Sequence, residues 1–260
     1  MLKILKYSFY DLMRSRWSYV YFIFYLLLGF VLLFLNNDVN KAVITLMNII
    51  IVLTPLIGTI FGVMYYYNSK EFTELLLAQP INRSKIFMGQ YLGISISLTL
   101  SLVLGLGIPF IAYGLFKSAA IFDFSLLLIV GSFLNFIFVA LSYNIALSTE
   151  NKIKGFGYAI LMWLFLAVIY DGLFLISLVL FDEYPLDKFS LIATMFNPID
   201  LSRILILLKL DISALLGYTG AVFKEFFGTN TGLITSLGLL SLWVLAPIWR
   251  INTKVKKKDF

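Results

Sequence analysis

Few residues in this sequence could perform chemistry, and none of them forms a familiar catalytic set. Histidine and cysteine are both absent, which removes imidazole bases, Ser-His-Asp triads, disulfides and thiolate metal sites. The seven Met residues are scattered without a paired M-x-x-M spacing, so they favour core filling over copper ligation. No G-x-x-x-x-G-K-[ST] motif occurs, so ATP cannot bind through a P-loop. The sequence predicts no catalytic residue, no metal site and no cofactor bound by this chain.

One carboxylate stands out because its surroundings are apolar. Asp171 is the only charged residue in the run 155–181. An ionisable group in such a run is a functional candidate, for contact with a substrate or for coupling of conformations. It could equally be an Asp that only pins helices together through a hydrogen bond, for example from Tyr170. Asn135 and Asn144, in the preceding apolar run, are candidate polar partners.

A second polar group follows Asn197-Pro198, a pair typical of a turn. Asp200 and Arg203 lie three residues apart on the helix expected after that turn, so their side chains can pair. The simplest interpretation is a helix start with a local ion pair, worth well under about 1 kcal/mol if exposed. The alternative is a docking surface for a partner on that side of the membrane.

The composition shows what must position these residues. Hydrophobic residues make up 61% of the chain and charged residues 13%, with a mean hydropathy of +0.96, whereas average globular chains carry roughly 25% charged residues. Uncharged runs separate the charges, and a helix needs about 20 apolar residues to cross a bilayer. We therefore predict an all-α integral membrane protein, a single transmembrane domain over 1–260. Its six spans are expected at about 17–37, 42–67, 88–116, 124–148, 156–181 and 228–249.

The charges predict the orientation of these spans. If the N-terminus is cytoplasmic, 14 of the 20 Lys and Arg residues fall in the inside segments. This bias fits the positive-inside rule, with both termini in the cytoplasm and the chain in a bacterial inner membrane. The net charge of +6 then reflects topology and contact with membrane lipid, and we expect no binding of nucleic acid.

Three segments outside the spans are expected to be helical. Residues 1–16 have apolar residues at helical spacing among basic ones, which predicts an interfacial amphipathic helix with Leu2, Leu5, Phe9, Leu12 and Met13 on its apolar face. The extracytoplasmic loop 182–227 mixes charges with apolar stretches too short to span, so short amphipathic helices at the outer face are expected. The cytoplasmic loop 70–86 forms the third.

This cytoplasmic loop has the most informative pattern. Glu71 to Gln79 suits a short helix with acidic residues in its first turn, Pro80 ends it, and Asn82 or Ser84 can cap the next helix. Leu75-Leu76-Leu77 would expose an apolar patch to the cytoplasm, which suits a docking surface. A plain surface loop is the alternative.

The stretch ELLLAQPINRSKIFMGQYLG (74–93) resembles the helix-turn-helix that follows the second span in ABC-2-type transporter permeases. The resemblance covers the whole six-span layout. It implies a coupling loop that contacts a separate ATPase subunit, which binds ATP and Mg and performs the hydrolysis. Glu74, Leu75, Pro80, Arg83 and Ser84 become ATPase-facing residues, and Glu71, Leu76, Ile81 and Asn82 belong to the same surface. Members of that family often have Lys where this chain has Gln90.

The stretch from Asn197 to Ile204 (NPIDLSRI), together with Tyr170-Asp171, resembles the NosY-type branch of these permeases. That resemblance implies a homodimer, a NosF-type ATPase and a periplasmic NosD-type protein, in a system that matures the copper centres of nitrous oxide reductase. Asn197, Pro198, Asp200 and Arg203 would then form the periplasmic partner site. An ABC-2 permease that exports another cargo, such as a lipid, peptide or drug, is the alternative.

Overall fold

The computed structural model describes residues 1–36, 39–118, 120–181, 184, 186–209 and 230–257, and that part of the chain contains helices but no strand. Positions 210–229, which the sequence assigned to the outer loop and the start of the last span, lie outside the described residues. The helices are α1 (Leu2–Arg14), α2 (Arg16–Asn36), α3 (Val39–Asn68), α4 (Lys70–Leu77), α5 (Arg83–Ala112), η1 (Leu115–Lys117), α6 (Ile121–Ser148), α7 (Lys152–Leu164), η2 (Phe165–Ile169), α8 (Tyr170–Leu180), α9 (Asp187–Met195), α10 (Pro198–Lys209) and α12 (Asn230–Lys257).

Six of these helical segments are long and apolar enough to cross a membrane: Arg16–Asn36, Val39–Asn68, Arg83–Ala112, Ile121–Ser148, Lys152–Leu180 and Thr231–Lys257. The predicted class, an all-α multi-pass membrane protein, is confirmed. The third span begins at Arg83 rather than 88 because Asn82 caps it, and it ends before Gly114, whose φ of 84° leaves the helix. The last helix continues beyond 249 into the basic tail.

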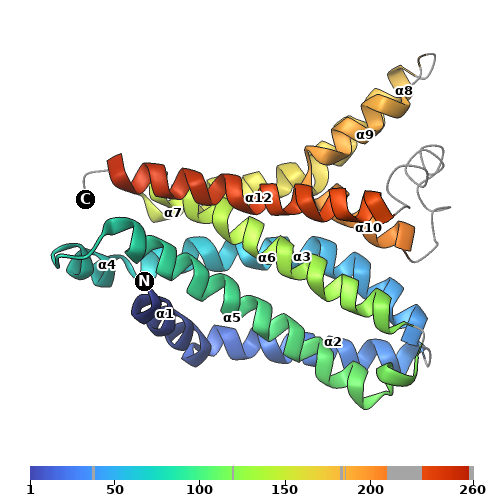
Figure 1. The fold of residues 1–260 in the computed structure, drawn as a ribbon, viewed down its shortest axis with the longest axis horizontal. Coiled ribbons are helices and arrows are strands. Elements are labelled where there is room, and N and C mark those ends of the chain that lie inside the picture. Colours follow the sequence, from blue (N-terminus) through green and yellow to red (C-terminus); the bar gives the residue numbers. More distant parts are fainter. Residues whose placement is uncertain (37–38, 119, 182–183, 185, 210–229, 258–260) are drawn as a thin grey trace.

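The spans lie side by side in one bundle (Figure 1). Helix α3 packs along α6, and α2 packs along α5. Gly62 lets α3 approach α6 closely, because a Cβ there would collide with Ser142 Oγ and lie 3.1 Å from the carbonyl oxygen of Val139. The core of the bundle is therefore built from α3, α5 and α6.

Most basic residues gather at one end of this bundle. Helices α1 and α4, the turn between α6 and α7, and the last turns of α12 all lie there (Figure 1). We call it the basic end. The opposite end carries η1, the last turn of α2 and the first turn of α3.

Helix α1 is amphipathic as predicted, but its buried face differs from the expected one. Ile4, Ser8 and Leu12 are its buried residues, whereas Leu2 is exposed. Two glycines of α5 explain the difference: a Cβ at Gly89 would lie 3.0 Å from Ile4, and one at Gly93 would lie 2.7 Å from Ser8. The α5 backbone thus accepts the small Ser8 directly, and the bulkier apolar residues of α1 flank this contact.

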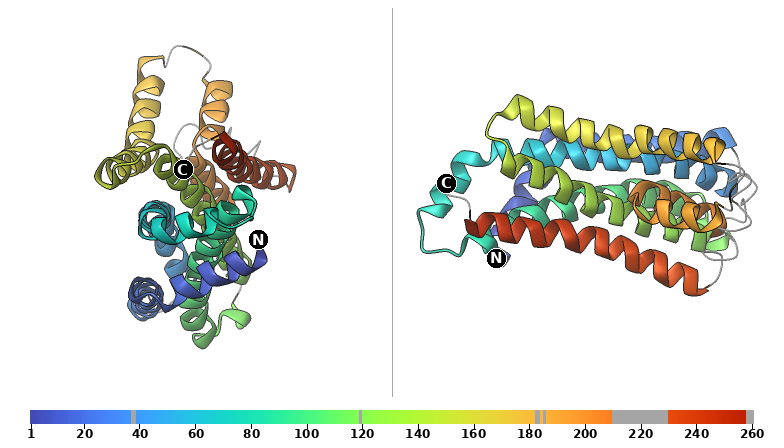
Figure 2. Two further views of the ribbon diagram at one scale, coloured as in Figure 1. Left: turned by 90° about the vertical axis from the view of Figure 1, so that its left-hand side faces the viewer. Right: turned by 90° about the horizontal axis from the view of Figure 1, so that it is seen from above.

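The fifth span lies at the edge of the bundle, where its α7 part packs on α3 and α6 and its α8 part projects outward. It runs through α7, one turn of π-helix (η2) and α8. Only 6% of its most apolar 18-residue stretch is buried inside the protein, against 56% of the corresponding stretch of α5. Helices α8 and α9 project together from the side of the bundle (Figure 2). Phe174 of α8 stacks on Phe189 of α9, and Tyr170 Oη donates to the carbonyl of Ala193 at 2.6 Å.

The predicted short helices between spans 5 and 6 are present as α9 and α10. What the sequence did not show is their path: the two helices bend by 116° at residues 196–197, and α10 packs against α3, α6 and α12. Nearly all of α10 is buried, including Ile199, Leu201 and Leu205. Helix α10 therefore enters the bundle between the spans, whereas α9 projects from it beside α8.

Candidate functional site

Helix α4 projects beyond the bundle at its basic end and presents two different faces (Figure 1). Glu71, Glu74 and Leu75 are exposed, and Leu75 keeps 68% of its surface. Lys70 and Glu74 form an exposed ion pair of 3.8 Å, which contributes little to stability. The outward face combines acidic groups with one large exposed apolar side chain.

The inward face of α4 is tied to the transmembrane core by buried hydrogen bonds. Thr73 Oγ1 donates to the carbonyl of Ser69 at 2.7 Å and accepts from Gln90 Nε2 at 2.8 Å. Gln90 Oε1 in turn accepts from Tyr143 Oη at 2.6 Å. Gln90 and Tyr143 are fully buried, so both partners of each bond are shielded from water. The chain of bonds therefore links α4 to both α5 and α6.

Two further contacts position α4. The ring of Phe72 stacks on Tyr7 of α1, with centroids 4.5 Å apart. At the start of α5, Asn82 Oδ1 accepts from the backbone N–H of Ser84 at 3.0 Å, which confirms the predicted cap. The α4–α5 turn is thus held at both of its ends.

The other predicted residues of this loop lie along the same outward turn. Pro80, Asn82 and Arg83 are exposed, whereas Leu76, Ile81 and Ser84 are half-buried. Sequence reasoning missed Thr73, Gln90 and Tyr143, which position the surface without belonging to it. A Gln about two turns into the helix of an apolar span was the available signal.

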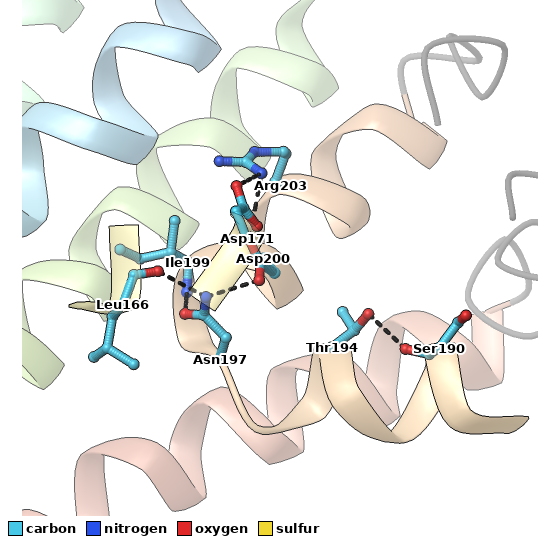
Figure 3. A network of polar contacts seen from close by, with 8 residues as sticks. All are labelled: Leu166, Asp171, Ser190, Thr194, Asn197, Ile199, Asp200 and Arg203. Atoms are coloured by element: carbon cyan, nitrogen blue, oxygen red, sulfur yellow. Dashed lines mark hydrogen bonds and ion pairs between the residues drawn. The ribbon is translucent and has the colours of Figure 1, made fainter. Parts of the chain in front are cut away.

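A second polar cluster lies where α8 meets α10 (Figure 3). Arg203 Nη1 donates to Asp171 Oδ2 at 2.6 Å and to Asp200 Oδ1 at 3.3 Å. The predicted pairing of Asp200 with Arg203 is confirmed, and Asp171 joins it from a different helix. One guanidinium faces two carboxylates, so the cluster holds one cation for two acidic groups.

Asn197 organises this cluster from the turn between α9 and α10 (Figure 3). Its Oδ1 accepts from the N–H of Ile199 at 3.0 Å and caps α10, with Pro198 in the first helical position. Its Nδ2 donates to Asp200 Oδ2 at 2.7 Å and to the carbonyl of Leu166 at 2.8 Å. Leu166 belongs to η2, where the π-helical turn frees a carbonyl for this contact. Asn197 therefore joins α10 to the fifth span.

The two asparagines of α6 do not reach this cluster. Asn144 Nδ2 donates to the carbonyl of Pro247 in α12 at 2.8 Å. Asn135 is fully buried beside Gly58 of α3, and within the described part of the chain its side-chain atoms have no hydrogen-bond partner. The partner of Asp171 is Arg203, and tertiary packing brings these residues together across 32 positions of sequence.

Burial limits what the Asn197–Arg203 segment can bind. Asn197, Pro198 and Asp200 lie in the interior, and Arg203 is half-buried. Their expected role as a partner surface would therefore require the α9–α10 pair to move. In this conformation they hold α10 against the fifth span.

Comparison with known proteins points to a class of membrane transporter. No family model matches the chain. It is, however, similar to ABC transporter permeases among curated proteins.

Two such relatives are named "Probable ABC transporter permease protein NosY". One, from Stutzerimonas stutzeri, is 26% identical over 179 residues, which cover 67% of this chain and 58% of the relative. The other, from Pseudomonas aeruginosa, is 25% identical over 189 residues, which cover 68% of this chain and 67% of the relative.

Proposed function

We propose that this chain is the transmembrane permease subunit of an ABC transporter and that a separate ATPase subunit docks on the α4–α5 turn. The ATPase binds ATP and Mg and performs the hydrolysis, since this chain has no P-loop motif. One observation carries the proposal: α4 exposes Glu71, Glu74 and Leu75 outside the bundle while its buried side is bonded to α5 and α6 through Gln90.

This arrangement suits the transmission of motion. A displacement of α4 by a docked ATPase would act on Thr73, then on Gln90 and Tyr143, because each is bonded to the next. Helix α6 packs against α3 and α12, so a shift there reaches most of the bundle. Coupling through packed side chains and hydrogen bonds needs such a physical connection.

The proposal places the basic end in the cytoplasm of a bacterial inner membrane, with both termini on that side. The distribution of Lys and Arg supports this orientation. We further propose that two copies of the chain form a homodimer. The exposed fifth span supports this, because its apolar face is left for lipid or for a second copy.

For the cargo, we propose the role that the NosY resemblance implies: maturation of the copper centres of nitrous oxide reductase, with NosF-type and NosD-type partners. Because the chain lacks His and Cys, copper itself is handled by the partners. This subunit then moves a sulfur-containing species or transmits motion across the membrane. The α9–α10 pair, at the end opposite α4, is the element that would signal to the periplasmic partner.

The test is purification of the tagged chain from its native membranes in mild detergent, followed by mass spectrometry of bound proteins and an ATPase assay. The variant Glu74→Lys/Arg83→Glu reverses two exposed charges on the α4–α5 turn without changing the net charge. Lys41→Glu/Asp123→Lys reverses one exposed and one half-buried charge at the opposite end, again without changing the net charge, and serves as the control.

We expect wild type and the control pair to retain an ATPase, and the α4–α5 pair to lose it. Loss in both pairs, or in neither, would contradict docking on this turn. Recovery of a periplasmic copper-site protein with the wild type supports the maturation role. An ATPase without such a partner leaves a permease for another cargo, and absence of any ATPase overturns the transporter proposal.

A further inference from the structure

A cavity of ≈ 690 Å³ lies between α6, α7 and α12 near the basic end. Its inner wall is largely apolar and aromatic, with Met162 from α7 and Trp243 and Pro247 from α12. Its mouth carries Arg250 and Lys254, one and two turns further along α12. The cavity is thus apolar in depth and basic at its rim.

A second cavity of ≈ 550 Å³ adjoins the first on the side of the charged tail. The two share Ser148, Arg250 and Lys254, and the second adds Lys257 and Glu150. Three cations and one carboxylate therefore line the pair of cavities, which leaves an excess of positive charge. The exposed ring of Trp249 immediately precedes Arg250, and exposed Trp side chains are typical of the membrane interface.

The structure holds this basic rim in place. Asn144 Nδ2 donates to the carbonyl of Pro247, which joins α6 to α12 beside the cavity. Lys254 Nζ donates to the carbonyl of Asn144 at 3.2 Å and also to Ser148 Oγ, so it is used in capping the end of α6. Arg250 and Lys257 line these cavities and form no salt bridge with the described residues, so their charges are available to a bound anion.

We propose that these joined cavities bind one acidic phospholipid of the adjacent leaflet. The phosphate lies between Arg250 and Lys257, and an acyl chain runs along Met162 and Trp243. Arg suits this task because its planar guanidinium forms paired hydrogen bonds with phosphate oxygens. Basic pockets between transmembrane helices on the cytoplasmic side are suited to acidic lipid headgroups.

The shape of the site favours a lipid over a soluble anion. A free phosphate would use only the rim and would leave the apolar wall against Trp243 without an occupant. A lipid fills both parts. Its charged headgroup would lie at the basic residues near the end of α12, and its acyl chain would lie against the apolar residues that precede them. This inference does not depend on the proposed ATPase.

The test is native mass spectrometry of the full-length protein titrated in detergent with dioleoyl-phosphatidylglycerol or dioleoyl-phosphatidylcholine. Arg250→Gln/Lys257→Gln removes two charges from the cavity rim. Lys154→Gln/Lys256→Gln removes two exposed charges from the same end that line neither cavity, and is the matched control. Ala246→Phe narrows the apolar part without changing the charge.

We expect wild type and the control pair to bind phosphatidylglycerol at least about tenfold more tightly than phosphatidylcholine. The rim variant should lose this preference, with binding weakened about 30-fold, as expected for two cations near an anionic surface. Ala246→Phe should weaken both lipids. An equal loss in the rim and control variants would reduce the effect to general surface charge and overturn the site.

Two further outcomes would also overturn it. Competition by millimolar sodium phosphate would show that a soluble anion is the occupant. In the second, Ala246→Phe leaves lipid binding unchanged, but the mass peak of a dimer or of a complex with another subunit disappears. That result would show that another polypeptide fills the cavity.

Discussion

Arg203 of α10 donates a 2.6 Å hydrogen bond to Asp171 of α8, and this contact joins the projecting fifth span to a helix buried in the bundle. Both side chains remain about 30% exposed, at 31% and 29%. Each alone would be costly in hydrocarbon, by roughly 2.5–3.5 kcal/mol at mid-bilayer. Their pairing explains how Asp171 can occupy an otherwise uncharged run.

The two residues of this pair are predicted to contribute differently to stability. Arg203→Gln removes the only cation of the cluster and leaves Asp171 and Asp200 facing each other. Asp171→Asn leaves Arg203 paired with Asp200, so one cation then faces one carboxylate. We expect Arg203→Gln to cost about 2–3 kcal/mol, less than a fully buried pair would, and Asp171→Asn about half as much.

Thermal unfolding in mild detergent would measure this difference, with Lys188→Gln on the exposed face of α9 as the control. The double variant Asp171→Asn/Arg203→Gln should be less destabilised than the sum of the single variants. Additive effects would mean that the two side chains do not interact.

A second prediction compares two asparagine caps of the same geometry. Asn82 and Asn197 each accept from the N–H two residues later at 3.0 Å, but only Asn197 also donates to Leu166 and Asp200. Asn82→Ala should therefore cost about 1 kcal/mol, the value of an exposed cap. Asn197→Ala should cost about 2–4 kcal/mol, because it also leaves buried acceptors without partners.

Asn197→Ser keeps a capping oxygen and should recover only part of that loss. Midpoints of thermal unfolding for the three variants would rank them. Equal costs for Asn82→Ala and Asn197→Ala would show that the contact with η2 contributes nothing.

The buried bonds beneath α4 lead to a third prediction. Tyr143→Phe removes the hydroxyl that donates to Gln90, whereas Tyr91→Phe removes a hydroxyl that donates to the carbonyl of Phe136. Tyr143→Phe should cost about 1–2 kcal/mol because Gln90 Oε1 loses its donor. Tyr91→Phe should cost about 1 kcal/mol because the carbonyl of Phe136, inside α6, keeps its helical hydrogen bond. Only Tyr143→Phe should loosen α4, because only Gln90 is also bonded to Thr73.

Hydrogen exchange of the backbone amides of 70–77 would report the effect. We expect faster exchange there in Tyr143→Phe and in Thr73→Val, and unchanged exchange in Tyr91→Phe. If all three variants behave alike, the hydrogen bonds through Gln90 do not hold α4.

A fourth prediction concerns the contact between α3 and α6. Gly62→Ala places a methyl group against Ser142 and the backbone of Val139, whereas Gly172→Ala on α8 places it in open space. The first change should cost about 1–3 kcal/mol through overpacking, and the second should be neutral or slightly stabilising. Gly62→Ala/Ser142→Ala should recover part of the lost stability. The midpoints of thermal unfolding of the three variants in detergent would measure these differences.

The sequence indicated several of these elements because local patterns specify them. Six apolar runs predicted six spans, and the start of α5 followed from the ability of Asn82 to cap it. Asp200 and Arg203 could be paired from their spacing, since residues three apart share a helix face.

Other contacts had no local pattern. Nothing near Asp171 in sequence identifies Arg203 as its partner, and Asn135 and Asn144 were equally plausible candidates. The buried face of α1 depends on Gly89 and Gly93, about 85 residues away, so periodicity alone gave an apolar face that differs from the buried one.

The sequence by itself determined that this protein is helical and membrane-embedded and which of its ends is basic, because hydropathy and charge are sums over local residues. The tertiary structure alone decided that α10 enters the bundle, that Asp171 meets Arg203, and that Gln90 ties α4 to the core. Those outcomes depend on which helices pack together. In so apolar a chain almost every helix face could be buried, so close packing at glycines and the pairing of a few polar groups select the arrangement.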